Sequence, residues 1–313
     1  MEENLLTLIN DAASAWPSGP YALGKTDSGW KALSFSQTRD RARAFAAWLL
    51  DRGYSPGRKG AILGEGSPEW IQGEFGLLTA GLVSVPLSAK LTREELRYRL
   101  LHSESEILLV SSNLLDKALT ALAASGTTGS ALGLTDTPAP ALVCLDSNIS
   151  RKRLCEKVKK AGFDCGNLVF LGQAIESGEA ALREKPELSK RLDSIAQSTQ
   201  SDSLAFICYT SGTSDNPKAV MLSHRNIRTN SHDAFVQFHT PRYKTLIVLP
   251  ADHAFIHTVA IFTALWCGVA LNFLDSRGGT MAGIRNIAGN IQECQPDFML
   301  TVPALSNNIQ KRI

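Results

Sequence analysis

The chain has 313 residues, of which 44% are hydrophobic and 20% are charged. That length allows about two domains, and this balance of apolar and charged residues excludes a disordered tail or a coiled coil. The 32 basic and 30 acidic residues leave a net charge of +2, so the overall field is too weak to gather nucleic acid, and we expect no nucleic-acid partner.

Short apolar runs separated by helix-length segments extend along the whole chain. Apolar residues between positions 42 and 50 repeat at helical spacing and predict an amphipathic helix that ends near Gly53. The predicted strands are 61–63, 82–87, 107–110, 141–145, 168–171, 204–209, 246–249, 270–274 and 298–302. Parallel strands need long crossover connections, which are usually helices. This alternation of strands and helices therefore predicts an α/β fold of mostly parallel sheets covered by helices on both faces.

Two helix starts carry capping signals. Thr92 precedes Glu95 by three residues, which is the spacing of a capping box. Ser67, Pro68 and Glu69 supply in order an N-cap, a first-turn proline and an acidic residue. Both signals predict helices and give these residues a structural role.

Two polar stretches are predicted to be surface insertions. Residues 124–140 are rich in Gly, Ser, Thr and Pro, and residues 173–202 mix polar residues with both charges, which suggests one exposed helix and a linker. We expect residues 1–200 to form a first α/β subdomain that carries these insertions. Residues 201–313 are expected to form a second α/β subdomain.

The six cysteines lack a CxxC pair or zinc-ligand spacing, so all are expected to be reduced thiols. The first residues show no secretory signal or Arg-rich transit peptide, which favours the cytoplasm.

Residues 254–274 carry no formal charge apart from any proton on His257, and that length could span a bilayer. His257, Gly268 and Asn272 favour instead a buried helix over 254–267 and a strand from 269, without a transmembrane span.

The strongest chemical signal lies between residues 204 and 224. An apolar strand leads into a loop of small and hydroxylated residues, and Lys218 follows. Such a loop offers polyphosphate closely spaced amides, hydroxyl donors and one mobile cation. It is not a Walker A loop, because Pro217 precedes the lysine and a strand is predicted to follow at 219–222. On composition alone, an ordinary Ser/Thr-rich turn is the alternative.

The sixteen residues from Tyr209 to His224, YTSGTSDNPKAVMLSH, resemble the phosphate-binding signature YTSGTTGxPKGVxxSH of the adenylate-forming superfamily. This superfamily contains the acyl-CoA synthetases and luciferase-like enzymes. Three flanking segments are similar to the same family: GSPEWIQGEFGLLTAGLVSVPL to its NSPEW…GAVYVPL stretch, LPADHAFIHT to LPLxH, and PDFMLTVPALSNNI to PTxxxxVPRLWEKI of the long-chain branch. The resemblance covers nearly the whole chain and is weakest across 113–201.

The resemblance implies a two-step reaction. A fatty carboxylate attacks the α-phosphorus of Mg²⁺-bound ATP to give an acyl-adenylate and pyrophosphate, and the thiol of coenzyme A then displaces AMP. ATP, Mg²⁺, coenzyme A and a fatty acid are therefore the implied cofactors and substrates. Because the carboxylate is already a nucleophile, the protein mainly has to align it and neutralise phosphate charge.

The same resemblance implies roles for single residues. It gives Thr210 and Lys218 a catalytic role, and it places His253 and Pro303 in the substrate site. The residues implied to hold the β- and γ-phosphates are Thr210, Ser211, Gly212, Thr213, Ser214 and Lys218. No residue is implied as a ligand of a resident metal.

Each of these roles has a simpler alternative. Lys218 could be a solvated surface lysine, and His253 could be satisfied by neighbouring carbonyls. His224 and Asn226 are expected to begin the helix after the motif, where capping is their role. Apolar residues after 254 could line an acyl tunnel, but buried helices are apolar with or without a ligand.

The sequence departs from the signature at Asp215 and Ala219, where the family usually has glycine. A carboxylate beside a triphosphate costs about 1–4 kcal/mol at surface-like screening, so a reduced nucleotide affinity is expected.

The family's YGxTE and TGD segments, its hinge and its mobile C-terminal domain would follow Ile313. We therefore expect residues 1–313 to be an incomplete N-terminal domain whose partner is that C-terminal domain, and to turn over poorly alone. The alternatives are a non-catalytic acyl- or nucleotide-binding fragment, or a fatty acyl-AMP ligase that feeds a carrier protein. A peripheral contact with membranes is compatible with all three.

Overall fold

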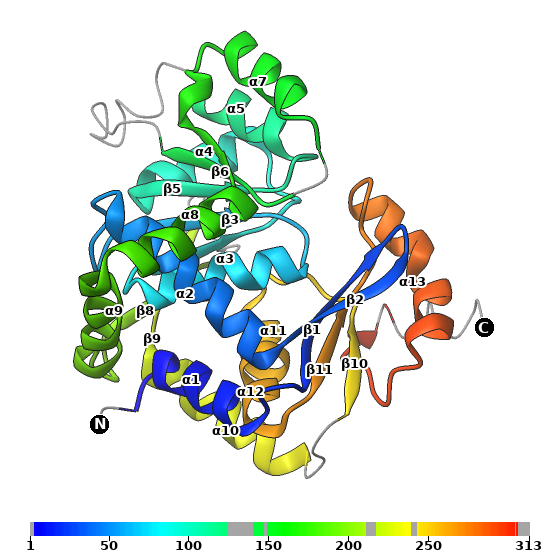
Figure 1. The fold of residues 1–313 in the computed structure, drawn as a ribbon. Coiled ribbons are helices and arrows are strands. Elements are labelled where there is room, and N and C mark those ends of the chain that lie inside the picture. The colour runs from blue at the N-terminus through cyan, green and yellow to red at the C-terminus, as the bar shows by residue number, and fades with distance from the viewer. Residues whose placement is uncertain are drawn as a thin grey trace.

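The structure is a computed structural model that describes residues 3–123, 140–146, 149–210, 217–238, 243–303 and 305. In these residues, seven strands form the larger of two sheets. Their order is β7-β6-β5-β3-β4-β8-β9 (Figure 1). The strands are β3 (Lys59–Leu63), β4 (Val83–Leu87), β5 (Ser105–Val110), β6 (Ala141–Cys144), β7 (Leu168–Phe170), β8 (Leu204–Thr210) and β9 (Lys218–Ser223). All pair in parallel except β9, which is antiparallel to β8.

Helices cover both faces of this sheet, as predicted. Alternate side chains of each strand enter opposite hydrophobic clusters, so that Ile62 faces one layer while Ala61 and Leu63 face the other. The first layer contains α2 (Phe35–Asp51), α3 (Pro68–Thr79), α8 (Leu171–Glu184) and α9 (Pro186–Ser198). The second contains α4 (Arg93–His102), α5 (Leu115–Ala123) and α7 (Arg151–Lys160).

The smaller sheet has the order β10-β11-β1-β2. Its strands are β1 (Pro20–Thr26), β2 (Gly29–Ser34), β10 (Lys244–Ile247) and β11 (Ala270–Phe273). The β1–β2 hairpin was not predicted, and its turn ends at Gly29, whose φ of 114° favours glycine. The sheets do not follow the expected division at residue 200, because β8 and β9 extend the larger sheet while β1 and β2 join strands from the C-terminal part.

One hydrophobic layer lies between the two sheets and contacts both. It combines α2 and α3 with α1 (Leu5–Ala15), α10 (His224–Phe238) and a continuous helical run after His253. This run consists of α11 (Ala254–Ile256), a π-helical segment η2 (His257–Phe262) and α12 (Thr263–Cys267). The run confirms the helix predicted over 254–267, and β11 confirms the strand after it. α13 (Thr280–Cys294) follows β11. In the described residues no helix is long and apolar enough to cross a membrane.

Both predicted helix starts are confirmed. The Ser67 hydroxyl accepts from the amide of Trp70, and Thr92 and Glu95 form a complete capping box. The predicted strand at 298–302 is reduced to an isolated bridge between Phe298 and Thr245.

The prediction of a surface insertion over 173–202 is wrong. The segment forms most of α8 and all of α9, which bury apolar residues including Leu188, Leu192 and Ile195. α8 packs so closely on α2 that a Cβ at Gly178 would lie 1.8 Å from the carbonyl oxygen of Ala44. The segment was misread because its polar residues hide a narrow apolar stripe on each helix. Most of the other proposed insertion, at 124–139, lies outside the described residues.

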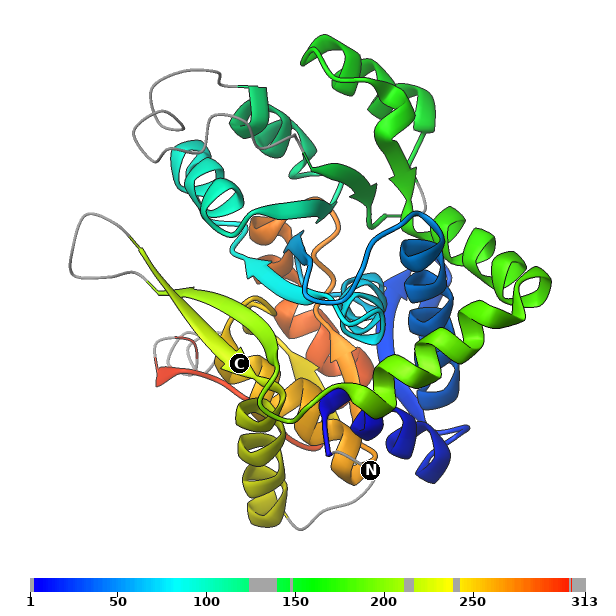
Figure 2. The ribbon, with the colours of Figure 1, turned by 90° about the vertical axis from the view of Figure 1, so that its left-hand side faces the viewer.

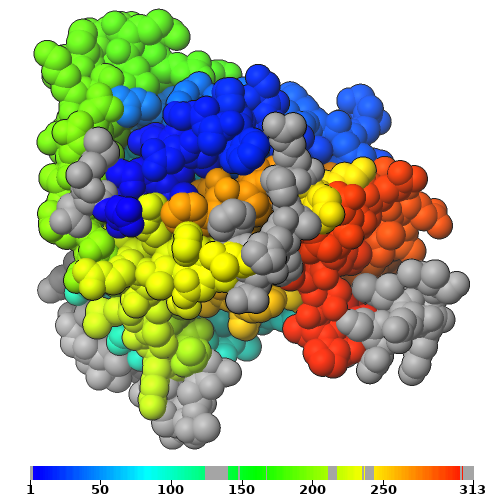
Figure 3. Space-filling view, turned by 90° about the horizontal axis from the view of Figure 1, so that it is seen from below, coloured from blue at the N-terminus to red at the C-terminus, as the bar shows by residue number. Residues whose placement is uncertain are grey.

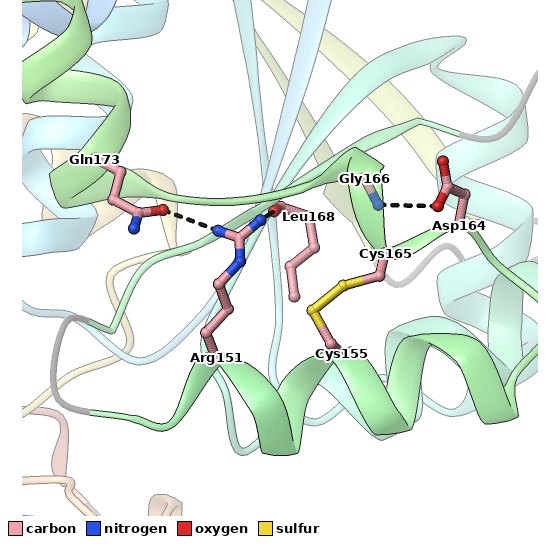
Figure 4. Close-up of a disulfide and its surroundings, with 7 residues drawn as sticks. All are labelled: Arg151, Cys155, Asp164, Cys165, Gly166, Leu168 and Gln173. Atoms are coloured by element: carbon pink, nitrogen blue, oxygen red, sulfur yellow. Dashed lines mark hydrogen bonds between the residues drawn. A yellow bond between two sulfur atoms is a disulfide. The ribbon is translucent and has the colours of Figure 1, made fainter.

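Cys155 on α7 and Cys165 in the short helix η1 (Cys165–Asn167) form a disulfide (Figure 4). The expectation that all six cysteines are reduced is therefore wrong for these two. Cys144, Cys208, Cys267 and Cys294 are free. The bridge holds the middle of α7 to the segment that enters β7, beside the contact of Arg151 with the Leu168 carbonyl.

We expect Cys155→Ser to lower the free energy of unfolding by about 2–3 kcal/mol, because a disulfide between residues 10 apart restricts the unfolded chain. Urea unfolding with and without a reducing agent measures this change. The reducing agent should destabilise the unmodified chain and leave Cys155→Ser unaffected. Six free thiols in the non-reduced protein, counted by mass spectrometry, would contradict the assignment.

His224, the last residue of the sequence motif, joins α10 to α1. The Nδ1 atom of His224 accepts from the amide of Leu5 at 3.3 Å, so this nitrogen carries no proton. Figure 3 shows α1 in blue on the same face of the molecule as α10 in yellow. The predicted capping role is thus wrong for His224 and confirmed for Asn226, whose side chain and that of Ser223 bond each other and each other's amides.

Burial lowers the pKa of His224 to about 4. Since the unfolded chain binds this proton near pH 6.5, stability should be complete above that pH and fall by about 3 kcal/mol as the pH drops toward 4. His224→Asn, which keeps an acceptor for Leu5, should flatten this dependence in urea unfolding at several pH values. The same substitution at the exposed His232 should leave the dependence unchanged, and a pH dependence equal in both variants would refute the prediction.

Candidate functional site

The β8–β9 hairpin carries the predicted phosphate-binding residues at the carboxyl end of β8. Thr210 and Lys218 are directly paired across the hairpin, and both are exposed. Figure 2 shows the two strands side by side in yellow-green at the left of the molecule. Because β8 is parallel to β4, Thr210 lies at the sheet edge where the other parallel strands also end. The expected strand after Lys218 is confirmed as β9.

Ser211, Gly212, Thr213 and Ser214 lie outside the described residues, as does Asp215. The two ends of the segment are placed, and their cross-strand pair fixes where the connecting residues leave and rejoin the sheet. In the described part of the chain Lys218 makes no ion pair, so its three N–H donors are available to an anion.

Tyr209 anchors the start of the motif to α4. Its hydroxyl lies 2.9 Å from Nδ1 of His102 and 3.3 Å from the carbonyl oxygen of Arg99. The Arg99 guanidinium stacks on the tyrosine ring at 5.5 Å from its centre. Burial first, and then the neighbouring Tyr98, raise the pKa of Tyr209 to about 12, so the phenol keeps its proton at neutral pH.

Sequence reasoning gave His102 and Arg99 no role in the site. They belong to a helix whose sequence, LTREELRYRLLHS, displays only its capping box, and their contact with Tyr209 joins residues more than 100 positions apart. Nothing in the sequence pattern could have revealed that pairing.

His253 lies in the loop 250–253 that follows β10. Its side chain is exposed, and its carbonyl oxygen accepts from the amide of Ile256 at 2.8 Å, so the residue begins α11. The side chain of the neighbouring Asp252 lies near Ser88, the residue after β4, which is among the groups that act on its pKa. The loop therefore lies near the carboxyl end of β4, which is the strand next to β8.

Buried carboxylates surround this junction. Burial raises the pKa of Asp252, while its backbone hydrogen bond, the two nearby histidines and Ser88 act in the opposite direction. The pKa of the Cys208 thiol is raised to about 12, mainly by burial and further by the charges of Glu74 and Asp252. Cys208 precedes Thr210 by two residues, so the charge of Asp252 acts near the end of β8.

Pro303 is exposed beyond the bridge that joins Phe298 to β10. Among the described residues no hydrogen bond or ion pair joins Pro303 to Thr210, Lys218 or His253.

The helical run after His253 packs against β10 and β11 around a small cavity. The cavity has about 10 Å³, which is space for roughly one water molecule. Its lining residues include Thr245, Val259, Ala260 and Phe298. In this arrangement the run forms core, and an acyl chain could enter only if the run moved away from the strands.

A wider polar cleft of about 470 Å³ lies between the sheets, at the carboxyl ends of β3, β5 and β6. Glu65, Glu69, Ser111 and Asp146 are among its lining residues. Neither Thr210 nor Lys218 lines it, so this cleft is separate from the hairpin. Among the described residues, no three His, Cys, Asp or Glu side chains lie close enough to hold a metal ion.

Comparison with known proteins agrees with this architecture. One curated relative is long-chain-fatty-acid–CoA ligase 5 of Rattus norvegicus. It is 27% identical over 303 residues, which cover 92% of this chain and 39% of the relative. A second, the chloroplastic long-chain-fatty-acid–[acyl-carrier-protein] ligase AEE15 of Arabidopsis thaliana, is 26% identical over 90% of this chain and 36% of its own length. The chain thus spans less than half the length of these curated relatives.

The fold is similar to that of the adenylation domain of a carboxylate reductase from Mycobacterium chelonae. That crystal structure superposes with a TM-score of 0.75 at 18% identity, over 99% of this chain and 47% of the other, and the likeness concerns the fold alone. The sequence pattern of one family extends over residues 10–312, almost from end to end. With its hairpin motif placed at the carboxyl edge of a mostly parallel sheet, the chain belongs to the family of AMP-binding enzymes.

Proposed function

We propose that the chain is the N-terminal part of an AMP-forming long-chain fatty acid–CoA ligase. In this proposal a fatty carboxylate attacks the α-phosphorus of ATP, pyrophosphate leaves, and coenzyme A then takes the acyl group from the adenylate. The proposal rests on the cross-strand pair of Thr210 and Lys218, which presents a hydroxyl and a cation at the ends of the motif loop.

The residues at the hairpin fit a nucleotide triphosphate. Lys218 would neutralise charge on the β- and γ-phosphates, Thr210 would donate its hydroxyl, and the loop amides and hydroxyls of residues 211–214 would complete the cradle. Mg²⁺ would arrive with ATP as part of the substrate, since magnesium in such sites is held largely by phosphates and water. His253 would line the place of the carboxylate, with Asp252 near the end of β4.

A fatty acyl-AMP ligase that feeds a carrier protein is the second candidate. The similarity to the acyl-carrier-protein ligase of Arabidopsis thaliana favours it, because that relative matches this chain about as well as the CoA ligases do. We propose the cytoplasm as the location of either activity.

Replacing Lys218 with Ala should weaken ATP binding about 10- to 100-fold, since hydrogen bonds to charged groups contribute about 1.5–3 kcal/mol. Isothermal titration of the 313-residue chain with Mg²⁺-ATP measures this. The matched control is Lys190→Ala on α9, another exposed lysine, which should bind ATP as the unmodified chain does. Equal affinity in both variants would remove Lys218 from the nucleotide site.

The chain by itself should bind ATP yet release little pyrophosphate with a long-chain fatty acid, because in the full-length family further segments complete the adenylate site. A coupled pyrophosphate assay, run beside a full-length relative as positive control, tests this expectation. Turnover comparable to that of the relative would show that these 313 residues contain the whole catalytic apparatus.

A further inference from the structure

A buried pair of ionisable side chains lies in the hydrophobic layer between the two sheets. Glu74 on α3 is 0% exposed, and His257, the first residue of η2, is 1% exposed. The Nε2 atom of His257 lies 2.9 Å from Oε1 of Glu74, and the hydroxyl of Ser84 on β4 donates to the same oxygen at 3.1 Å. This pair joins a helix of the larger sheet to the crossover helix of the smaller one.

Both ring nitrogens of His257 face oxygen acceptors. While Nε2 faces the carboxylate of Glu74, Nδ1 lies 3.3 Å from the carbonyl oxygen of His253. A backbone carbonyl never donates, so Nδ1 must carry a proton. If Glu74 is ionised, Nε2 must carry one as well, and the ring is then an imidazolium ion.

The surroundings favour the ionised pair. The titratable side chains in electrostatic contact with the pair are Asp252 from the loop before η2, Cys208 from β8 and Tyr21 from β1. The aromatic rings of Phe206 and Trp70 cover the imidazole. Burial alone would lower the pKa of His257, but the charge and hydrogen bond of Glu74 outweigh it and raise the pKa above its usual value.

Oxygen Oε2 of Glu74 and the indole Nε1 of Trp70 are buried and have no hydrogen-bond partner among the described residues. In that part of the chain His257 is therefore the cation that balances the Glu74 charge. Removing either member would leave the other buried without a counter-charge, which is costly.

We propose that His257, held as an imidazolium ion by Glu74, is a positioning residue that fixes the 250–253 loop beside the ends of β4 and β8. One N–H group holds the backbone of His253, and the other is tied to α3. The proposal rests on the proposed function, because the loop owes its importance to His253 and its closeness to Thr210.

The geometry explains how the position is transmitted. Ser84 on β4, which donates to Glu74, lies four residues before Ser88, the residue after that strand, and the side chain of Asp252 lies near Ser88. Phe206, whose ring meets the His257 ring edge-on at 5.0 Å, precedes Thr210 by four residues on β8. The charged contact between His257 and Glu74 ties the start of η2 to α3, and such a contact is about twice as strong as a neutral hydrogen bond.

The first test reads the charge of His257 directly. In the ¹⁵N-histidine-labelled 313-residue chain, both ring nitrogens of His257, assigned by their loss in His257→Gln, should still give imidazolium signals at a pH where the histidines of the urea-unfolded chain have become neutral. A nitrogen of His257 without a proton at pH 7 would overturn the proposal.

The second test measures how firmly the 250–253 loop is held in place. Amide hydrogen exchange of Ile256 and His257, whose N–H groups bond the His253 carbonyl, should be at least 10-fold faster in Glu74→Gln and in His257→Gln. Leu192→Ala on α9 is the control, because it destabilises the same hydrophobic layer without touching the loop. Unchanged exchange in both charge variants, or an equal increase in the control, would overturn the positioning role.

Ligand binding separates this proposal from the function on which it rests. Glu74→Gln should weaken the binding of palmitate in the presence of ATP about 10-fold and leave ATP binding itself unchanged. An unmodified chain that binds neither ligand would contradict the proposed function, and the charge and exchange measurements would still decide the state of His257. Equal palmitate affinity in Glu74→Gln and the unmodified chain would overturn the positioning role.

Discussion

The parallel pairing of β8 with β4 is the constraint on which the candidate site depends. It sends the chain out of the sheet at the same edge as β3, β5 and β6, and the antiparallel return of β9 then sets Lys218 opposite Thr210. In open α/β sheets, ligands bind outside the carboxyl ends of the strands, because loops there can vary while the sheet stays rigid. The hairpin uses this rule, with a strand in place of the usual helix after the loop.

The shared layer between the sheets has a second role, since it couples the hairpin to the smaller sheet. The loop after β10 reaches the end of β4 through Asp252 and Ser88, and the crossover helix behind it is buried against α3. Apolar packing alone would tolerate small sliding of these helices. Directional contacts, such as the Tyr21 hydroxyl bonded to the Ile261 carbonyl at 2.9 Å, specify one arrangement.

Sequence patterns predicted the larger sheet well, because each of its inner strands is a short apolar run between helix-length segments. They failed where polar residues made the apolar pattern of a helix or strand weak. β1 and β2 carry polar and charged residues on a half-exposed hairpin, and α8 and α9 each show a narrow apolar stripe inside a polar composition. The disulfide between Cys155 and Cys165 was missed because a separation of ten residues matches no recognised motif.

The sequence by itself determined the chemistry of the motif: the hydroxyls, the small residues and the lysine that a phosphate group requires are adjacent in the chain, so their spacing could be read directly. It also determined the inner strands of the larger sheet and the capped starts of α3 and α4, since apolar runs and capping are local. Only the tertiary structure decided that Tyr209 contacts His102, that Asp252 reaches Ser88 and that His257 pairs with Glu74. These contacts join residues from about 100 to more than 180 positions apart, and their formation depends on the strand order and the helix packing, which local patterns do not encode.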